Sequence, residues 1–297
     1  MVATRKTKKK PVFLVVAVPL VLLIAYFAVK PDRWYMLTAG TLRQEISVKK
    51  NRGTMEEYTL ADMQENALFQ FDQSLILVNT DYMLAEDFVA EIAEYKGTGV
   101  MMNACILNAY EALAGAVKTK TGDKLYISSG IRDRARQQEL YEEDPKTATV
   151  PGASEHETGL CLDVYAAYFA GDGFLKSEAG QFVNSYCDEY GFIIRYPSYG
   201  EKETGIRFEP WHIRYVGFPH SEIIYNNRLT LEEYIFSLEE GECYEANGYL
   251  ITRQRPTDGK VQVPAGCESY TVSPDNTGCY IITGKKTVMV MKYLETV

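Results

Sequence analysis

The residues best suited to chemistry are two of the three histidines in this 297-residue chain. They lie in two motifs, Ser154-Glu-His156-Glu-Thr-Gly-Leu-Cys-Leu-Asp163 and Glu209-Pro-Trp-His212. Two imidazoles and one carboxylate are a common ligand set for a catalytic zinc ion, which keeps its fourth position open for water. We therefore predict that His156, Asp163 and His212 bind one zinc ion, and that Glu209 is the base that activates the water.

The spacing of these residues excludes a helical zinc site. His156 and the glutamate after it begin like the His-Glu-x-x-His motif, but leucine stands at position 160, where that motif requires its second histidine. Pro210 prevents a regular helix through the second motif. In an extended chain Glu209 and His212 would take opposite faces, so we expect the backbone to turn at Pro210.

Two predicted strands hold the motifs. The first spans residues 160–165, where alternation places Gly159, Cys161 and Asp163 on one face. If Asp163 faces the metal, Cys161 faces it as well. The second strand spans residues 211–216 and carries His212.

The hydrophobic pattern predicts the elements around these strands. Helices are expected at residues 100–118, 132–143, 182–190 and 230–240, and further strands at 75–78, 124–128 and 192–195. After residue 247, alternating runs at 249–252, 260–263, 280–283 and 287–293 are separated by turn residues, which is typical of a small β structure. We expect the domain that carries the metal motifs to span 70–240, after a spacer at 34–69 and before a β-rich appendage at 241–297.

The N-terminus has the pattern of a membrane anchor. Basic residues between positions 5 and 10 precede an uncharged apolar run at 12–29. A bilayer core is spanned by about 20 apolar residues, and basic residues before the span stay in the cytoplasm. We therefore predict a cytoplasmic tail and one transmembrane helix within residues 1–33, with the catalytic domain extracytoplasmic. A cleaved signal peptide is the alternative, but bulky Tyr26 stands where its cleavage pattern requires a small residue.

Charge and cysteine usage limit the partners. The formal net charge is −9 although the N-terminus is basic, so the exported part is acidic and we expect no nucleic-acid partner. The six cysteines show no Cys-x-x-Cys spacing, which argues against a cysteine zinc cluster. Export permits disulfides, and the sequence leaves open whether the cysteines pair or stay free.

The two motifs together resemble the VanY-type D-alanyl-D-alanine carboxypeptidases. This group of peptidoglycan zinc peptidases also includes D,D-dipeptidases and L,D-carboxypeptidases. Further matching segments are Leu77-Val-Asn79, Ser129-Gly-Ile-Arg132 with Gln137, Arg195-Tyr-Pro197 and the run from Glu209 to Gly217. The resemblance covers residues 70–236. Cys161 departs from it, because the family usually carries alanine there.

The resemblance implies an α+β fold, with helices packed on a small antiparallel sheet that carries the zinc. It implies His156, Asp163 and His212 as zinc ligands and Glu209 as the general base. It also implies that Arg132 binds the substrate and stabilises developing negative charge. The residues expected to line the substrate site are Gln137, Ser154, Tyr196 and Trp211.

The function implied is removal of the C-terminal D-alanine from peptidoglycan stem peptides. An L,D-carboxypeptidase acting on tetrapeptide stems shares these motifs and is the first alternative. A non-catalytic wall-binding or sensing module is the second, and it would be marked by loss of a zinc ligand or of the base. His220 lies outside the motifs, and we expect it to be structural.

Overall fold

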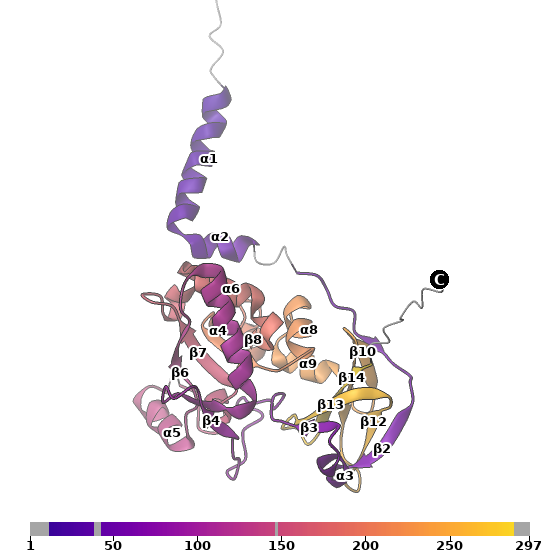
Figure 1. The fold of residues 1–297 in the computed structure, drawn as a ribbon. Coiled ribbons are helices and arrows are strands. Elements are labelled where there is room, and N and C mark those ends of the chain that lie inside the picture. Colours follow the sequence, from indigo (N-terminus) through magenta and orange to yellow (C-terminus); the bar gives the residue numbers. More distant parts are fainter. Residues whose placement is uncertain (1–11, 39–42, 146–147, 288–297) are drawn as a thin grey trace, which may run out of the picture. The chain divides into compact units, whose positions relative to one another are not determined.

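The structure, a computed structural model, describes residues 12–38, 43–145 and 148–287. It separates into an N-terminal unit up to residue 42 and a second unit from residue 43 onward. In the first unit, α1 (Val12–Val29) covers the apolar run and α2 (Pro31–Thr38) follows it (Figure 1). Among the helices of the described residues, none is both long and apolar enough to cross a membrane.

A four-stranded antiparallel sheet carries both predicted metal motifs. Its order is β6 (Tyr126–Ser129), β7 (Cys161–Tyr165), β9 (His212–Tyr215) and β8 (Phe192–Ile194). Leu162 and Val164 of β7 share one hydrophobic core with helices α4 (Leu107–Thr121) and α6 (Glu178–Tyr186) (Figure 1). Because side chains alternate along a strand, Cys161 and Asp163 take the opposite face. The expected α+β architecture is therefore present.

Short elements connect this sheet to its surroundings. In chain order they are β4 (Ile92–Glu94), β5 (Met101–Asn103), η1 (Ala104–Ile106), α5 (Arg134–Glu143), η2 (Glu155–Thr158), η3 (Gly171–Lys176), η4 (Cys187–Tyr190), α7 (Glu201–Thr204), α8 (His220–Asn226) and α9 (Leu231–Ser237). The helix predicted at 100–118 begins later, because residues 101–103 pair with β4 instead. Thr230 and Glu233 cap α9 reciprocally, as their spacing predicts.

The segment at residues 75–78, which the sequence predicts as a strand, is buried but belongs to no sheet. Side chains bind its carbonyl groups. Arg214 Nη2 donates to the carbonyl oxygens of Ser74 and Ile76 at 3.0 and 2.8 Å. Asn276 Nδ2 donates to the carbonyl oxygen of Leu77 at 3.0 Å. The apolar run is explained by burial rather than by strand pairing.

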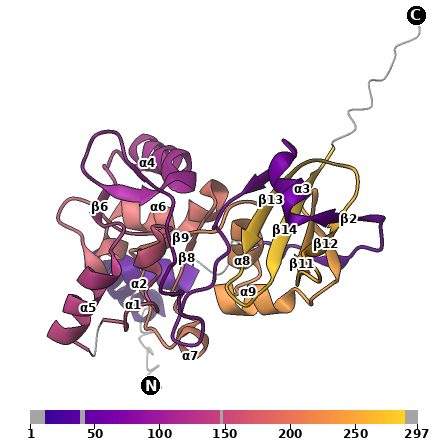
Figure 2. The same cartoon turned by 90° about the horizontal axis from the view of Figure 1, so that it is seen from below.

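The appendage is built from both ends of the second unit. Its six-stranded sheet has the order β1 (Lys49–Lys50), β10 (Cys243–Ala246), β11 (Tyr249–Gln254), β14 (Tyr280–Lys286), β13 (Cys267–Pro274) and β3 (Phe69–Phe71). A second pair joins β12 (Lys260–Pro264) to β2 (Met55–Thr59), and α3 (Leu60–Glu65) follows β2 (Figure 2). The region expected as a spacer at 34–69 thus contributes two of these strands and a helix. Of the strand predicted at 287–293, residues 288 onward lie outside the described residues.

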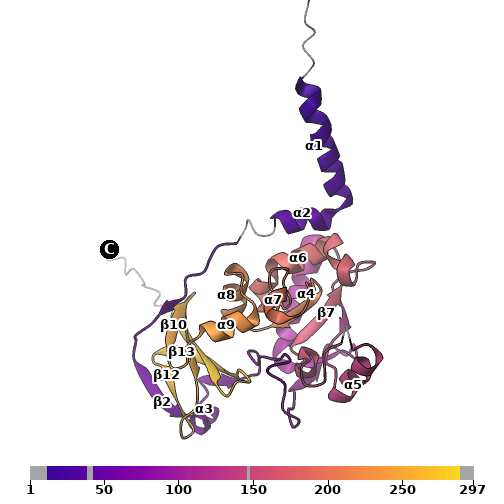
Figure 3. The ribbon, with the colours of Figure 1, turned by 180° about the vertical axis from the view of Figure 1, so that it is seen from behind.

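The appendage is joined to the catalytic domain by a shared core. Ile223 of α8 and Ile235 of α9 pack in one buried cluster with Ile193 of β8 and with Ile251 and Ile281 of the appendage sheet. Figure 3 shows α8 and α9 beside β10 and β13. These two helices therefore couple the two sheets. All six cysteines are free thiols.

Asp188 in η4 is a buried carboxyl that should make stability depend on pH. One of its oxygens is buried with no hydrogen-bond partner, and burial raises the pKa of Asp188 to about 7. The folded state binds the Asp188 proton more tightly than the unfolded state does. The resulting contribution to the free energy of unfolding is therefore complete below the ordinary aspartate pKa. The free energy of unfolding should fall by up to about 4 kcal/mol as pH rises from about 4 to 7.

Urea unfolding of Asp188→Asn between pH 4 and pH 8 measures this effect. The variant should lose most of the pH dependence and be more stable than the wild type at pH 8. Glu189→Gln, which changes the exposed carboxylate next to it, should keep the dependence. Equal slopes for Asp188→Asn and the wild type would contradict the prediction.

Candidate active site

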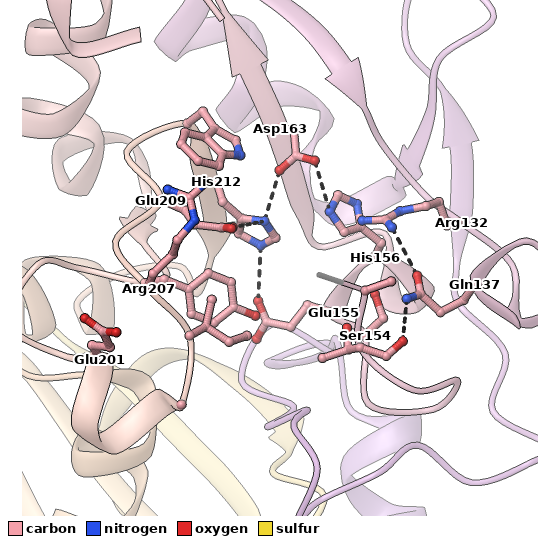
Figure 4. A pocket seen from close by; sticks show the side chains of 16 residues that line it. Arg132, Gln137, Ser154, Glu155, His156, Asp163, Glu201, Arg207, Glu209 and His212 are labelled. Atoms are coloured by element: carbon pink, nitrogen blue, oxygen red, sulfur yellow. Dashed lines mark hydrogen bonds and ion pairs between the residues drawn. The ribbon is translucent and has the colours of Figure 1, made fainter. Parts of the chain in front are cut away.

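The pairing of two strands brings the two motifs together. Asp163 on β7 lies directly opposite His212 on β9 in the antiparallel register. Its carboxylate contacts both histidines: Oδ1 is 3.0 Å from His212 Nδ1, and Oδ2 is 3.4 Å from His156 Nε2 (Figure 4). The three predicted zinc ligands therefore meet at one point.

The 3-10 helix η2 sets the direction of His156. Its Nδ1 lies 2.7 Å from the carbonyl oxygen of Gly130, which leaves Nε2 directed at Asp163. The helix ends at Gly159, whose φ is +67° and whose Cβ, if it had one, would lie 2.8 Å from the backbone nitrogen of Asn103. Only glycine fits this close, left-handed turn between the histidine and the strand of the aspartate.

A tight turn brings Glu209 back toward His212. The backbone nitrogen of His212 donates to the carbonyl oxygen of Glu209 at 3.1 Å, which closes the turn at Pro210 that the sequence predicts. Glu209 Oε2 then lies 3.9 Å from His212 Nδ1. Burial raises the pKa of Glu209 above its ordinary value, although His212 offsets part of the effect. A carboxylate with a raised pKa beside the metal position suits a general base.

Cys161 adds a thiol to the same point. Its ligand atom and those of His156 and His212 lie within 4.8 Å of one another, and the side chain is fully buried. Burial raises the pKa of this thiol, but the two histidines outweigh it and bring the pKa to about 7. The sequence predicts this shared face. Asp163 stays the predicted third ligand, because its two oxygens contact both histidines.

The residues present fit a zinc ion. Burial lowers the pKa of His156, but Cys161 and Asp163 outweigh it and raise that pKa to about 9. The same neighbours raise the pKa of His212 against the effect of its burial. Neighbours that favour the cationic form of both imidazoles would equally favour a divalent cation, whose binding displaces those protons. Two imidazoles and a carboxylate are the donors that zinc prefers in catalytic sites.

The predicted substrate residues line one cavity of about 590 Å³ with the metal ligands. They are Arg132, Gln137, Ser154, Tyr196 and Trp211. Figure 4 labels the first three of them. Arg132 Nη1 donates to Gln137 Oε1 at 3.1 Å, and Gln137 Nε2 donates to the carbonyl oxygen of Thr149 at 2.7 Å. Arg132 Nε is buried without a hydrogen-bond partner. The arginine is therefore held at one edge while part of its fork stays available for a ligand.

The structure adds residues that the motifs did not indicate. Glu201 and Arg207 line the cavity, and Arg207 lies over the Trp211 ring at 5.1 Å while it pairs with Asp172. Glu155 is buried behind the ligands, where its charge partners come from distant segments. Burial raises the pKa of Glu155, but two arginines outweigh it and hold that pKa well below its ordinary value.

His220 is structural, as expected. It is buried, its Nδ1 lies 2.6 Å from the Tyr234 hydroxyl and its Nε2 lies 3.0 Å from Thr283 Oγ1. Burial lowers its pKa to about 3, so it stays neutral. It joins α8 and α9 to the appendage and does not line the cavity.

Several known proteins are similar to this chain in sequence and in fold. A sequence model of the family VanY, described as D-alanyl-D-alanine carboxypeptidase, matches residues 99–218. A D-alanyl-D-alanine carboxypeptidase of Enterococcus faecium is 33% identical over 261 residues, which cover 79% of this chain and 82% of the relative.

Two solved structures are also similar. VanYB in complex with D-alanine-D-alanine has 30% identity and a TM-score of 0.51, and the match covers 56% of this chain and 99% of that one. The LdcB LD-carboxypeptidase has 30% identity and a TM-score of 0.51 over 55% of this chain and 86% of that one. The chain belongs to the VanY family of D-alanyl-D-alanine carboxypeptidases.

Proposed function

We propose that this enzyme removes the C-terminal D-alanine from peptidoglycan stem peptides ending in D-Ala-D-Ala. One observation carries the proposal: a metal-binding cluster, a carboxylate base and a partly free arginine share a single cavity. The relative from Enterococcus faecium and the VanYB complex with D-alanine-D-alanine support the choice of substrate.

The proposed mechanism assigns metal binding and proton transfer to different residues. His156, Asp163 and His212 would hold the zinc ion, which when bound polarises the scissile carbonyl and makes a water molecule more acidic. Glu209 accepts the proton of the attacking water and returns it to the leaving amine. The raised pKa of Glu209 makes its carboxylate a stronger proton acceptor for the attacking water.

Arg132 supplies the preference for a chain end. A carboxypeptidase must distinguish a free terminal carboxylate from an internal peptide bond, and a planar guanidinium binds a carboxylate through two parallel hydrogen bonds. The contact with Gln137 holds one edge of the Arg132 fork in place. The orphaned Nε of Arg132 marks a donor that a substrate carboxylate would satisfy.

Amidated substrates test this assignment. Converting the substrate terminus to an amide removes a charge-assisted pairing worth about 1.5–3 kcal/mol, so kcat/KM should fall about ten- to a hundredfold. Arg132→Ala should lose most activity on free termini and show little further loss on amides. Arg132→Lys should also be poor, because an ammonium lacks the planar fork.

The matched control is Arg207→Ala, which removes another cation from the same cavity. It should retain the preference for free termini. Equal cleavage of free and amidated peptides by the wild type would make the chain an endopeptidase and overturn the proposal.

An L,D-carboxypeptidase is the second candidate, favoured by the similarity to the LdcB LD-carboxypeptidase. Mass spectrometry of defined pentapeptide and tetrapeptide stems separates the two. Conversion of the pentapeptide to a stable tetrapeptide supports D,D-cleavage. Conversion of the tetrapeptide to the tripeptide, with the pentapeptide untouched, supports the alternative.

We also propose that the enzyme is anchored in the cell membrane by its N-terminal apolar run, with the catalytic domain outside. The proposal rests on the basic residues before positions 12–29. Protease added to wall-free cells should digest the catalytic domain while a cytoplasmic marker stays intact. Protection of the domain until lysis would overturn this placement.

A further inference from the structure

Glu155 lies in a buried ionic network directly behind the zinc ligands. Its Oε1 accepts hydrogen bonds from Arg195 Nε at 2.7 Å and from Arg214 Nη1 at 2.6 Å. Arg195 is paired in addition with Glu232, so two buried carboxylates balance two buried guanidinium groups. The side chains of Glu155 and Arg214 are 0% exposed. These hydrogen bonds hold the Glu155 carboxylate in one orientation.

The second oxygen of Glu155 has no partner within this network. Oε2 is buried without a hydrogen bond, and so is Nε2 of His212. These two orphaned atoms face one another at 3.8 Å (Figure 4). A shift of less than about 1 Å would bring them to hydrogen-bond distance. The network therefore presents one oxygen to the ring of His212.

Whether Glu155 Oε2 accepts a hydrogen bond from His212 depends on which ring nitrogen of His212 carries the proton. Nδ1 of His212 faces Asp163 and Glu209, so it is the atom that would bind the metal. A neutral imidazole that binds through Nδ1 carries its proton on Nε2. That proton points at Glu155. Metal-bound histidines commonly donate their second nitrogen to a carboxylate or carbonyl, which fixes the tautomer and raises the basicity of the ring.

We propose that Glu155 is a positioning residue that accepts the Nε2 proton of His212 and thereby holds this histidine in its metal-binding tautomer and orientation. The two histidines then differ in kind. His156 faces a neutral carbonyl of Gly130, whereas His212 faces an ionised carboxylate. A charged acceptor forms the stronger hydrogen bond with a ring N–H, so the orientation of His212 should be the more firmly held of the two. The inference rests on the proposed function only in taking His212 as a metal ligand.

Zinc affinity of the full-length chain is the first test. Chelator competition should show that Glu155→Gln weakens zinc binding about ten- to a hundredfold. The matched control is Glu232→Gln, which removes a carboxylate from the same arginine but has no contact with His212. It should lower the melting temperature and leave zinc affinity unchanged. Equal zinc affinities for Glu155→Gln and the wild type, or equal losses in both variants, would overturn the proposal.

Nitrogen-15 spectra of the zinc-loaded wild type give a test that needs no Glu155 variant. With three histidines in the chain, and His220→Gln to assign one, the signals are separable. We expect His212 to carry its proton on Nε2, shifted further downfield than the Nδ1 proton of His156. A proton on Nδ1 of zinc-bound His212, or an unshifted Nε2 proton, would overturn the proposal. Neither readout depends on peptide cleavage, so a chain that bound zinc but failed on D-Ala-D-Ala would refute the proposed function alone.

Discussion

Replacing His212 or His156 by alanine is expected to abolish zinc binding and, with it, measurable carboxypeptidase activity. Each histidine is one of the three proposed protein ligands, and Asp163 contacts both, so loss of either would leave an incomplete set. Catalysis needs the metal both to activate water and to polarise the carbonyl. Metal content by mass spectrometry and turnover of a D-Ala-D-Ala peptide measure the two effects together.

His220→Gln is the control for these variants. His220 is also buried, but it bridges Tyr234 and Thr283 away from the cavity. This variant should be less stable and still bind one zinc ion per chain. Stoichiometric zinc in the double variant His156→Ala/His212→Ala would refute the ligand assignment.

Glu209→Gln is expected to fold and keep its zinc but to lower kcat by about two to four orders of magnitude, the range for a lost general base. Glutamine has nearly the same shape and cannot accept a proton from water. Steady-state kinetics and metal content of the same sample separate the two roles. KM should change little, because the carboxylate works in the chemical step rather than in binding.

Glu201→Gln provides the comparison for Glu209. Glu201 lines the same cavity from α7, and Figure 4 shows its carboxylate turned away from the histidines. It should therefore retain near wild-type kcat. If Glu209→Gln lost zinc instead of rate, Glu209 would be a ligand and Asp163 would need reassignment.

The local parts of the site could be predicted from the sequence because short-range rules determine them. Alternation along β7 places Cys161 beside Asp163, and Pro210 forces the turn that returns Glu209 to His212. Each rule involves residues a few positions apart. That β7 and β9 lie close together could also be predicted, because the two motifs must meet if they bind one metal ion.

Features that depend on distant partners could not be predicted. Glu155 lies between two motif residues and looks like a solvent-exposed acid, since the arginines that bury it come from 40 and 59 positions later. The apolar run at 75–78 has the composition of a strand, but Arg214 donates hydrogen bonds to carbonyl oxygens in and next to this run, in place of a neighbouring strand. The short polar strands β1 and β2 show no alternation that would mark them. Tertiary context alone decides such cases.

The pairing of β1 with β10 and of β2 with β12 has a consequence for how the chain folds. Asn51 and Glu245 are hydrogen-bonded across 194 positions of sequence, so the N-terminal strands stay unpaired until the C-terminal strands have been synthesised. Such high contact order slows folding. The appendage sheet is therefore completed last, and it packs against α8 and α9 through the shared core. A stop codon near residue 240 would therefore leave β1, β2 and β3 as exposed edges prone to aggregation, even with every active-site residue in place.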